Sequence, residues 1–273
     1  MYTVLWQGQS SESFTIGNGV RQGAVASPLF FNLYIDSLFT ELKESGYGCY
    51  IDSMFHGAVG YADDIALMSP TRKGLQTLID ICEKYFSNLG ITISTNIIPE
   101  KSKTKILYFG DISNPQPLTL YDKLLPYVVE SKHLGHLINT DESMDHDLLL
   151  KRREFIGKFN SLRQELGQQD PYVYLRLIKT YLLHLYGSPL WHLSGAGVEK
   201  LWCTWHVLLR SLFSLPLATH RYILEGISST EHLKVTVLKR FSKFNDKLLS
   251  SNNPLINNLY NFGLFLPIFI EIE

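Results

Sequence analysis

Cysteine is scarce in this chain of 273 residues, and neither sign of charge is in large excess. Cys49, Cys82 and Cys203 lie far apart without paired spacing, so the sequence indicates neither a disulfide framework nor a zinc site, and a reducing compartment fits. There is no apolar run long enough to span a bilayer and no signal-peptide pattern. These absences favour an intracellular protein, in the nucleus or the cytoplasm, with no membrane partner.

The net charge of −1 hides an uneven distribution along the chain. Residues 1–149 hold 10 Lys and Arg against 17 Asp and Glu, and residues 150–273 hold 15 against 9, which gives −7 and +6. An acidic half followed by a basic half suits a metal-and-nucleotide site beside an element that grips phosphates. It equally suits two ordinary domains with unequal surfaces, so charge alone leaves both interpretations open.

The N-terminal part of the chain shows short strand patterns and helical ones in turn. Tyr2 to Leu5 predict a short strand, and Pro28 opens a helical pattern with Ser27 as its candidate N-cap. Two short apolar runs on either side of Ala62-Asp63-Asp64 predict a β-hairpin. Apolar residues from Leu75 to Leu89 recur at helical spacing, and Gly90 is a natural C-cap.

Further strands are expected at Ile91 to Ile93 and at Ile106 to Phe109. From about residue 145 onward the pattern becomes helical. The expected helices cover residues 148–166, 172–186, 200–215 and 230–249. This order predicts an α+β domain with a mostly antiparallel sheet over residues 1–140, followed by an α-helical region over 141–273.

The acidic pair in Tyr61-Ala62-Asp63-Asp64 is the sharpest chemical feature of the sequence. Adjacent side chains diverge at a hairpin turn, so one carboxylate can face a cleft while the other supports it. Mg²⁺ prefers carboxylate oxygens together with substrate phosphates, and two such ions can activate a 3′-hydroxyl and stabilise a leaving pyrophosphate. Taken alone, however, an Asp-Asp dipeptide is more often a solvated turn.

Two other segments are weak signals when each is taken alone. Gly19-Val20-Arg21-Gln22-Gly23, followed by Ser27-Pro28, could place backbone amides and Gln22 against a nucleotide and template, or it could be a tight loop before a capped helix. The run Lys101-Ser102-Lys103-Thr104-Lys105 could neutralise or protonate a phosphate, although such a run is more commonly solvated surface.

In combination, the order and spacing of these segments resemble the reverse transcriptases of non-long-terminal-repeat (LINE-type) retrotransposons. The resemblance rests on Gly19 to Gly23 with Ser27-Pro28 and Phe31 to Asp36, on Tyr61 to Asp64, on Gly90 to Lys105 and on His133 to Ile138. It covers about the first 140 residues with specific motifs and the helical remainder only loosely.

The resemblance implies a polymerase palm over residues 1–140 and a helical thumb or connection over 141–273. It implies an RNA-directed DNA polymerase that uses Mg²⁺, with Mn²⁺ as an alternative, and adds deoxynucleoside triphosphates to a DNA primer on an RNA template. The implied catalytic residues are Asp63, Asp64 and Lys103, of which Asp63 and Asp64 are the metal ligands. Template and nucleotide would be contacted by Arg21, Gln22, Gly23, Ser27, Pro28 and Tyr61. The primer grip would be His133, Leu134 and Gly135, where His133 stands in place of the family's usual aromatic residue.

Family members carry another catalytic aspartate and a fingers region upstream of the Gly-Val-Arg-Gln-Gly motif. Only 18 residues precede Gly19 here, and Glu12 is their sole acidic residue. We therefore expect an N-terminally truncated domain that polymerises at or near background by itself, with exposed apolar patches and poor solubility.

The alternative is a non-catalytic module, derived from a retroelement, that binds nucleic acid or another protein. The basic run Lys151-Arg152-Arg153 supports it, and Trp191, Trp202 and Trp205 could offer stacking surfaces. Tryptophans at helical spacing more often pack a core, and core packing is the favoured expectation. The pairs His133/His136 and His184/His192 have no acidic or cysteine partners at convincing spacing, so no metal site is expected there.

Overall fold

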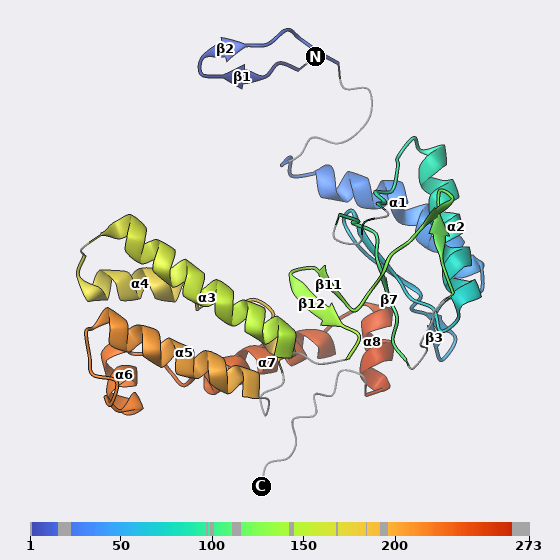
Figure 1. The fold of residues 1–273 in the computed structure, drawn as a ribbon. Coiled ribbons are helices and arrows are strands. Elements are labelled where there is room, and N and C mark those ends of the chain that lie inside the picture. The colour runs from blue at the N-terminus through green and yellow to red at the C-terminus, as the bar shows by residue number, and fades with distance from the viewer. Residues whose placement is uncertain are drawn as a thin grey trace. The chain divides into compact units, whose positions relative to one another are not determined.

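The computed structural model describes residues 2–15, 23–96, 98, 101–110, 116–141, 145–167, 169–183, 185–191 and 196–263 (Figure 1). The chain forms two compact units, Met1–Thr95 with Gln116–Leu124, and Asn96–Pro115 with Leu125–Glu273. The predicted domain division near residue 140 stays a prediction.

The first unit contains small β-hairpins and two long helices. Its elements are β1 (Leu5–Trp6), β2 (Gln9–Ser10), α1 (Ser27–Glu44), β3 (Tyr50–Ile51), β4 (Met54–Phe55), β5 (Ala58–Tyr61), β6 (Asp64–Leu67), α2 (Arg72–Asn88), β8 (Thr119–Leu120) and β9 (Lys123–Leu124).

Helix α1 begins with proline in its first turn, as the sequence predicts, but Ser27 is not its N-cap. The cap residue is Ala26, which makes no side-chain cap hydrogen bond. The amide of Ser27 donates to Ala24 O at 3.2 Å. The helix therefore starts one residue earlier than a serine N-cap at position 27 would place it. The helix ends at Glu44, and Gly46 follows at φ 71°.

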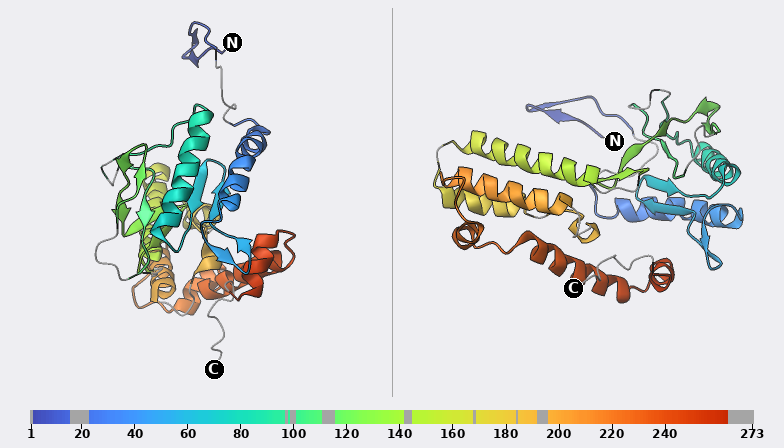
Figure 2. Two further views of the ribbon diagram at one scale, coloured as in Figure 1. Left: turned by 90° about the vertical axis from the view of Figure 1, so that its right-hand side faces the viewer. Right: turned by 60° about the horizontal axis from the view of Figure 1, so that its bottom comes forward.

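Helix α2 matches its predicted pattern closely. The Thr71 side chain caps its first turn by accepting from Gly74 N–H, and Gly90 follows the last turn at φ 68°. Figure 2 shows α1 in blue and α2 in teal beside the strands of this unit. The two helices share one core, whose buried residues are Ile35, Leu38, Leu42, Phe55, Ala58, Leu78, Cys82 and Phe86.

The expected strand at Ile91 to Ile93 does not form. The amide of Ile91 turns back to bond Phe86 O at 2.9 Å, and the amide of Ile93 donates to the Tyr121 hydroxyl at 3.2 Å. The helix end and a tyrosine from a distant hairpin therefore take the hydrogen bonds that a strand partner would have supplied.

The N-terminal half of α1 exposes large apolar side chains. Leu29, Phe30, Leu33 and Tyr34 are each more than half exposed. This agrees with the exposed apolar surface that the sequence led us to expect. The poor solubility predicted from that surface stays a prediction.

The second unit is mainly helical. Its elements are β7 (Ile106–Leu107), β10 (Tyr127–Val128), β11 (Glu130–His133), β12 (His136–Asn139), α3 (Asp145–Leu166), α4 (Pro171–Tyr181), the 3₁₀ helix η1 (Ser188–Leu190), α5 (Ala196–Leu212), α6 (Arg221–Ser228), α7 (Leu233–Leu249) and α8 (Pro254–Asn261). Helix α4 ends five residues before the predicted end at Tyr186, and Leu185 beyond it has a positive φ of 43°.

Three tryptophans lie in the core of the second unit. Trp191, Trp202 and Trp205 are each at most 2% exposed, so they offer no surface for base stacking. The core between α3, α4, α5 and α7 also includes Phe155 and Phe159. Core packing, the favoured expectation for these tryptophans, is confirmed.

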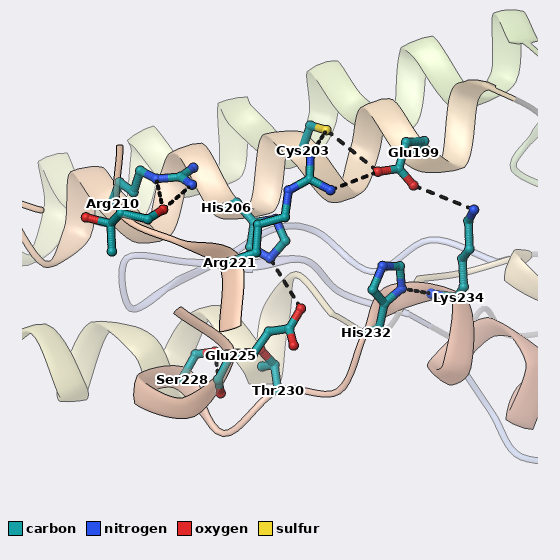
Figure 3. A network of polar contacts seen from close by, with 11 residues as sticks. Glu199, Cys203, His206, Arg210, Arg221, Glu225, Ser228, Thr230, His232 and Lys234 are labelled. Carbon is teal, nitrogen blue, oxygen red and sulfur yellow. Dashed lines mark hydrogen bonds and ion pairs between the residues drawn. The ribbon is translucent and has the colours of Figure 1, made fainter. Parts of the chain in front are cut away.

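A polar network joins α5, α6 and the start of α7 at the edge of this core (Figure 3). Arg221 Nη1 lies 3.3 Å from Glu199 Oε1, and Lys234 Nζ lies 3.7 Å from Glu199 Oε2. His206 lies among these groups and is only 1% exposed.

The α+β class is confirmed. In the described ranges, five strand pairs are antiparallel and one, β7 with β10, is parallel. Each pair is a separate two-stranded sheet. The helices therefore supply most of the core residues in each unit, and the antiparallel strands form short hairpins.

Candidate functional site

The hairpin of β5 and β6 carries the acidic pair. Tyr61 pairs with Asp64 across the strands, and Ala62 and Asp63 form the connecting turn. Ala62 adopts a positive φ of 53°, an uncommon conformation for a residue with a Cβ. The side chains of Tyr61, Asp63 and Asp64 are all exposed. The predicted hairpin is confirmed, and both carboxylates are open to a ligand.

A close contact with α1 holds this hairpin in place. Gly60 in β5 has the ring of Phe39 directly over it, and a Cβ there would come 2.5 Å from Phe39 Cζ. Behind the turn, Ala58 is buried and Met68 N–H donates to Gly57 O at 2.7 Å. The helix that starts at Ser27-Pro28 thus also supports the strand that leads to Asp63.

Gly60→Ala is expected to lower the free energy of unfolding by about 1 to 3 kcal/mol, because the added methyl group overlaps the Phe39 ring. Thermal unfolding measures the change. Gly157→Ala in α3 is a comparison without a collision, since a Cβ there meets no atom within 4 Å, and it should raise the stability by up to about 1 kcal/mol because alanine is the better helix former. Adding Phe39→Leu should recover part of the loss. A midpoint for Gly60→Ala no lower than that of the wild-type chain would show that Phe39 does not support the strand.

The donor set at the turn suits a hard divalent cation that shares its coordination with a substrate. Mg²⁺ commonly takes one or two carboxylates plus waters and phosphate oxygens, and Asp63 and Asp64 supply two carboxylates. Among the described residues, no group of three or more His, Cys, Asp or Glu side chains gathers as a metal site. Such a pair fits an ion that a nucleotide helps to hold, and does not fit an all-protein metal cage.

The predicted template- and nucleotide-binding segment is only partly described. Arg21 and Gln22 lie outside the described residues. Gly23 has a φ of 82°, and a Cβ there would meet no atom within 4 Å. The conformation therefore favours glycine, and the space beside it is open. Ser27 and Pro28 lie in the first turn of α1.

Lys103 belongs to the second unit and has an exposed side chain. Its neighbour Ser102 is 3% exposed. The Ser102 hydroxyl accepts from Asn96 N–H at 3.3 Å and donates to Thr104 O at 2.6 Å. The buried serine fixes the backbone of this turn, so the adjacent lysine amine is presented to solvent.

The hairpin expected at His133 to Ile138 forms from β11 and β12. His133 pairs with His136, and Leu134 and Gly135 make a two-residue turn with φ of 46° and 83°. Two positive φ values are the signature of the tight turn that joins antiparallel strands. The Tyr186 hydroxyl donates to Leu134 O at 3.0 Å.

The sequence did not predict which side chains hold this turn, because they come from distant segments. Lys151 Nζ donates to Gly135 O at 2.8 Å. Arg152 Nε donates to Thr204 Oγ1 at 2.7 Å, and Lys151 and Arg152 are both half-buried. Of the basic run 151–153, only Arg153 is exposed. The run is therefore weaker support for a nucleic-acid surface than its sequence suggested.

The family follows from the match between the N-terminal half of the chain and a known domain. A family model described as reverse transcriptase (RNA-dependent DNA polymerase) matches residues 1–138, about half of the chain. The chain belongs to the reverse transcriptase family. The matched segment includes the hairpin with Asp63 and Asp64 and nearly all of the β11–β12 hairpin.

Two curated relatives come from non-long-terminal-repeat elements, as the sequence motifs predicted. The Pol polyprotein of the type-2 retrotransposable element R2DM from Drosophila melanogaster is 31% identical over 135 residues, covering 50% of this chain. The Pol polyprotein of the type-1 retrotransposable element R2 from Nasonia vitripennis is 35% identical over 131 residues, covering 45%. The part that aligns with this chain is 12% of the length of each relative, so the chain spans only a small part of these proteins.

Reverse transcriptases as a family use divalent metal ions, an RNA template, a primer and deoxynucleoside triphosphates; for this chain these stay a proposal. Of the helices that the structure describes, none combines the length and apolar character needed to cross a membrane. The localisation predicted from the sequence stays a prediction.

Proposed function

We propose that this reverse transcriptase domain adds deoxynucleotides to the 3′ end of a primer on an RNA template. Residues 1–140 would serve as the palm, and residues 141–273 as a helical thumb or connection. The observation that carries this proposal is the exposed pair Asp63-Asp64 at a hairpin turn inside the segment that the family model matches.

Each predicted site residue has a role in this proposal. Asp63 is the direct ligand of Mg²⁺ or Mn²⁺, and Asp64 supports it. When bound, the metal would favour the 3′-hydroxylate and neutralise the leaving pyrophosphate. The exposed, positively charged amine of Lys103 offsets part of the negative charge of the triphosphate.

The remaining roles concern the nucleic acid. Arg21, Gln22 and Gly23, with Ser27 and Pro28, would face template and incoming nucleotide, and the open space at the Gly23 Cα suits a close approach. Tyr61 precedes the acidic turn with its ring exposed. His133, Leu134 and Gly135 would lie against the primer strand.

Single-turnover primer extension on an RNA template tests the proposal. The protein is in excess, reaction times are long, and Asp63→Ala/Asp64→Ala is the comparison. By itself the wild-type chain should incorporate only slightly above background. That incorporation should require Mg²⁺ and should fall to background in the double variant, because metal coordination is worth several kcal/mol in the transition state. Binding to the primer–template should be unchanged and should weaken steeply with salt.

Two outcomes would contradict the proposal. Equal incorporation by both proteins would show that Asp63 and Asp64 do not carry the reaction. No incorporation by the wild-type chain, together with salt-sensitive binding, would favour the alternative, a nucleic-acid-binding module derived from a retroelement. The buried tryptophans remove one of the features that had supported that alternative.

A further inference from the structure

The turn of the β11–β12 hairpin is held by side chains from two other segments of the second unit. Its two carbonyl oxygens each accept a hydrogen bond, Leu134 O from the Tyr186 hydroxyl at 3.0 Å and Gly135 O from Lys151 Nζ at 2.8 Å. The Lys151 amine also lies 5.8 Å from the centroid of the Tyr186 ring, within the range of a cation–π contact. The two donors that hold the turn thus also interact with each other.

A buried carboxylate holds the first residues of β12. Asp147, in the first turn of α3, is only 3% exposed. Its Oδ1 accepts from Leu137 N–H at 3.0 Å, and its Oδ2 lies 3.3 Å from His136 Nδ1. A carboxylate buried to this degree is costly unless it is hydrogen-bonded. Asp147 therefore resists any movement of the hairpin that would break these contacts.

The His136 ring completes the cluster. It stacks on Tyr186 with centroids 5.3 Å apart and planes inclined at 24°. Gly187 lies under the same imidazole, so that a Cβ there would fall 1.8 Å from His136 Cε1. The Tyr186-Gly187 pair thus offers an aromatic face and a side-chain-free backbone to the histidine.

Helix α7 holds the segment that carries Tyr186. The Arg240 guanidinium donates to Leu183 O at 2.8 Å, to Leu185 O at 3.3 Å and to Ser188 Oγ at 3.4 Å. These acceptors lie on both sides of Tyr186 in the chain. The fork geometry of arginine suits donation to several acceptors, and these bonds fix the backbone from which the tyrosine projects.

We infer that Tyr186, supported by Arg240, is a positioning residue that sets where the Leu134-Gly135 turn meets the primer strand. This inference rests on the proposed function, which places the primer at that turn. Placement of the primer end matters for nucleotidyl transfer, because misplacement of reacting groups by about 1 Å can cost about 100-fold in rate. Lys151 and Asp147 hold the same turn from α3.

The test uses Tyr186→Phe in the full chain, a change that keeps the ring and removes only the hydroxyl that bonds Leu134 O. Tyr222→Phe is the matched control. Tyr222 also stacks on a histidine, His220, at 5.6 Å and 23°, and it is 70% exposed. Both variants therefore remove a tyrosine hydroxyl beside a histidine stack, and only Tyr186→Phe touches the hairpin turn.

Two readouts separate the inference from the proposed function. Hydrogen exchange of the free protein should speed up about fivefold at the amides of residues 134–137 in Tyr186→Phe, the effect of losing one hydrogen bond of ordinary strength, and should not change in Tyr222→Phe. With a primer–template whose 3′-terminal base is 2-aminopurine, Tyr186→Phe should alter the fluorescence of that base while the affinity stays within about twofold.

If hydrogen exchange at the amides of residues 134–137 were the same in Tyr186→Phe as in the wild-type chain, Tyr186 would not hold the turn and the inference would be overturned. Faster exchange with an unaltered terminal base would overturn the link to the primer and would leave the proposed polymerase function intact. A wild-type chain that binds no primer–template would contradict the proposed function instead. The exchange data would then still decide whether Tyr186 holds the turn.

Discussion

Replacing Gly187 by alanine should lower the free energy of unfolding by about 2 to 4 kcal/mol. Two costs add. A left-handed conformation costs a residue with a Cβ about 1 kcal/mol more than glycine, and Gly187 has a φ of 78°. Overpacking costs about 1 to 3 kcal/mol in addition, because the new methyl group would lie 1.8 Å from His136 Cε1.

Gly167→Ala provides the matched control for this prediction. Gly167 has a φ of 64°, and a Cβ there would meet no atom within 4 Å. It should therefore show the conformational cost without the collision. Urea unfolding of both variants gives the two free energies, and their difference isolates the contact with His136.

The collision also makes a local prediction. His136 has to leave its stack on Tyr186, so its hydrogen-bonding contact with Asp147 should be lost as well. In NMR spectra, the His136 ring signals should then lose the shift caused by the Tyr186 ring. Gly187→Ala and Gly167→Ala with equal stabilities would show that the imidazole does not lie over Gly187.

Acidification should destabilise the chain through His206 between pH about 6.5 and pH about 4. The pKa of His206 is lowered from 6.5 to about 4, first by burial of the ring and then by the nearby positive charges of Arg221 and Arg210. The unfolded chain takes up a proton near pH 6.5, and the folded chain only near pH 4. The stability contributed by the neutral histidine is therefore complete above pH 6.5 and is lost as the pH falls.

The packing around His206 explains this pKa. Its ring contacts Trp202 edge-on at 4.4 Å. Within the described part of the chain, neither ring nitrogen has a hydrogen-bond partner, and the nearest carboxylate oxygen, Glu225 Oε1, is 3.8 Å from Nε2 (Figure 3). An imidazolium here would be desolvated and repelled by Arg221 and Arg210, which is why the neutral form is favoured although Glu225 is near.

Urea unfolding at pH 7.5, 6 and 5 measures the effect. A pKa difference of one unit corresponds to about 1.4 kcal/mol, so the wild-type chain should lose about 2 kcal/mol through this residue by pH 5. His206→Gln cannot titrate and should show a shallower loss, whereas His220→Gln at an exposed position serves as the control. If His206→Gln kept the wild-type pH dependence, the histidine would not be the group responsible.

Local pattern was enough to predict the elements whose hydrogen bonds are satisfied nearby. The β5–β6 hairpin, α2 with its Gly90 end and the β11–β12 hairpin all follow from short-range turn and helix signals. The same local motifs predicted the family, since Tyr61 to Asp64 and His133 to Ile138 fall within the matched segment. Patterns of this kind depend on residues a few positions apart.

Tertiary contacts decided what those patterns left open. Ile91 to Ile93 is not a strand, because Tyr121 takes one of its amides. Two residues of the basic run at 151–153 are half-buried, because Lys151 and Arg152 find acceptors at Gly135 and Thr204.

The support of the β11–β12 turn could not be predicted for the same reason. Tyr186 lies 52 positions from Leu134, and Arg240 lies 57 positions from Leu183. No periodicity links residues so far apart in the chain, and only packing of the folded helices brings them together. The sequence therefore specified the two hairpins and the acidic pair, and the fold selected the residues that hold the β11–β12 turn in place.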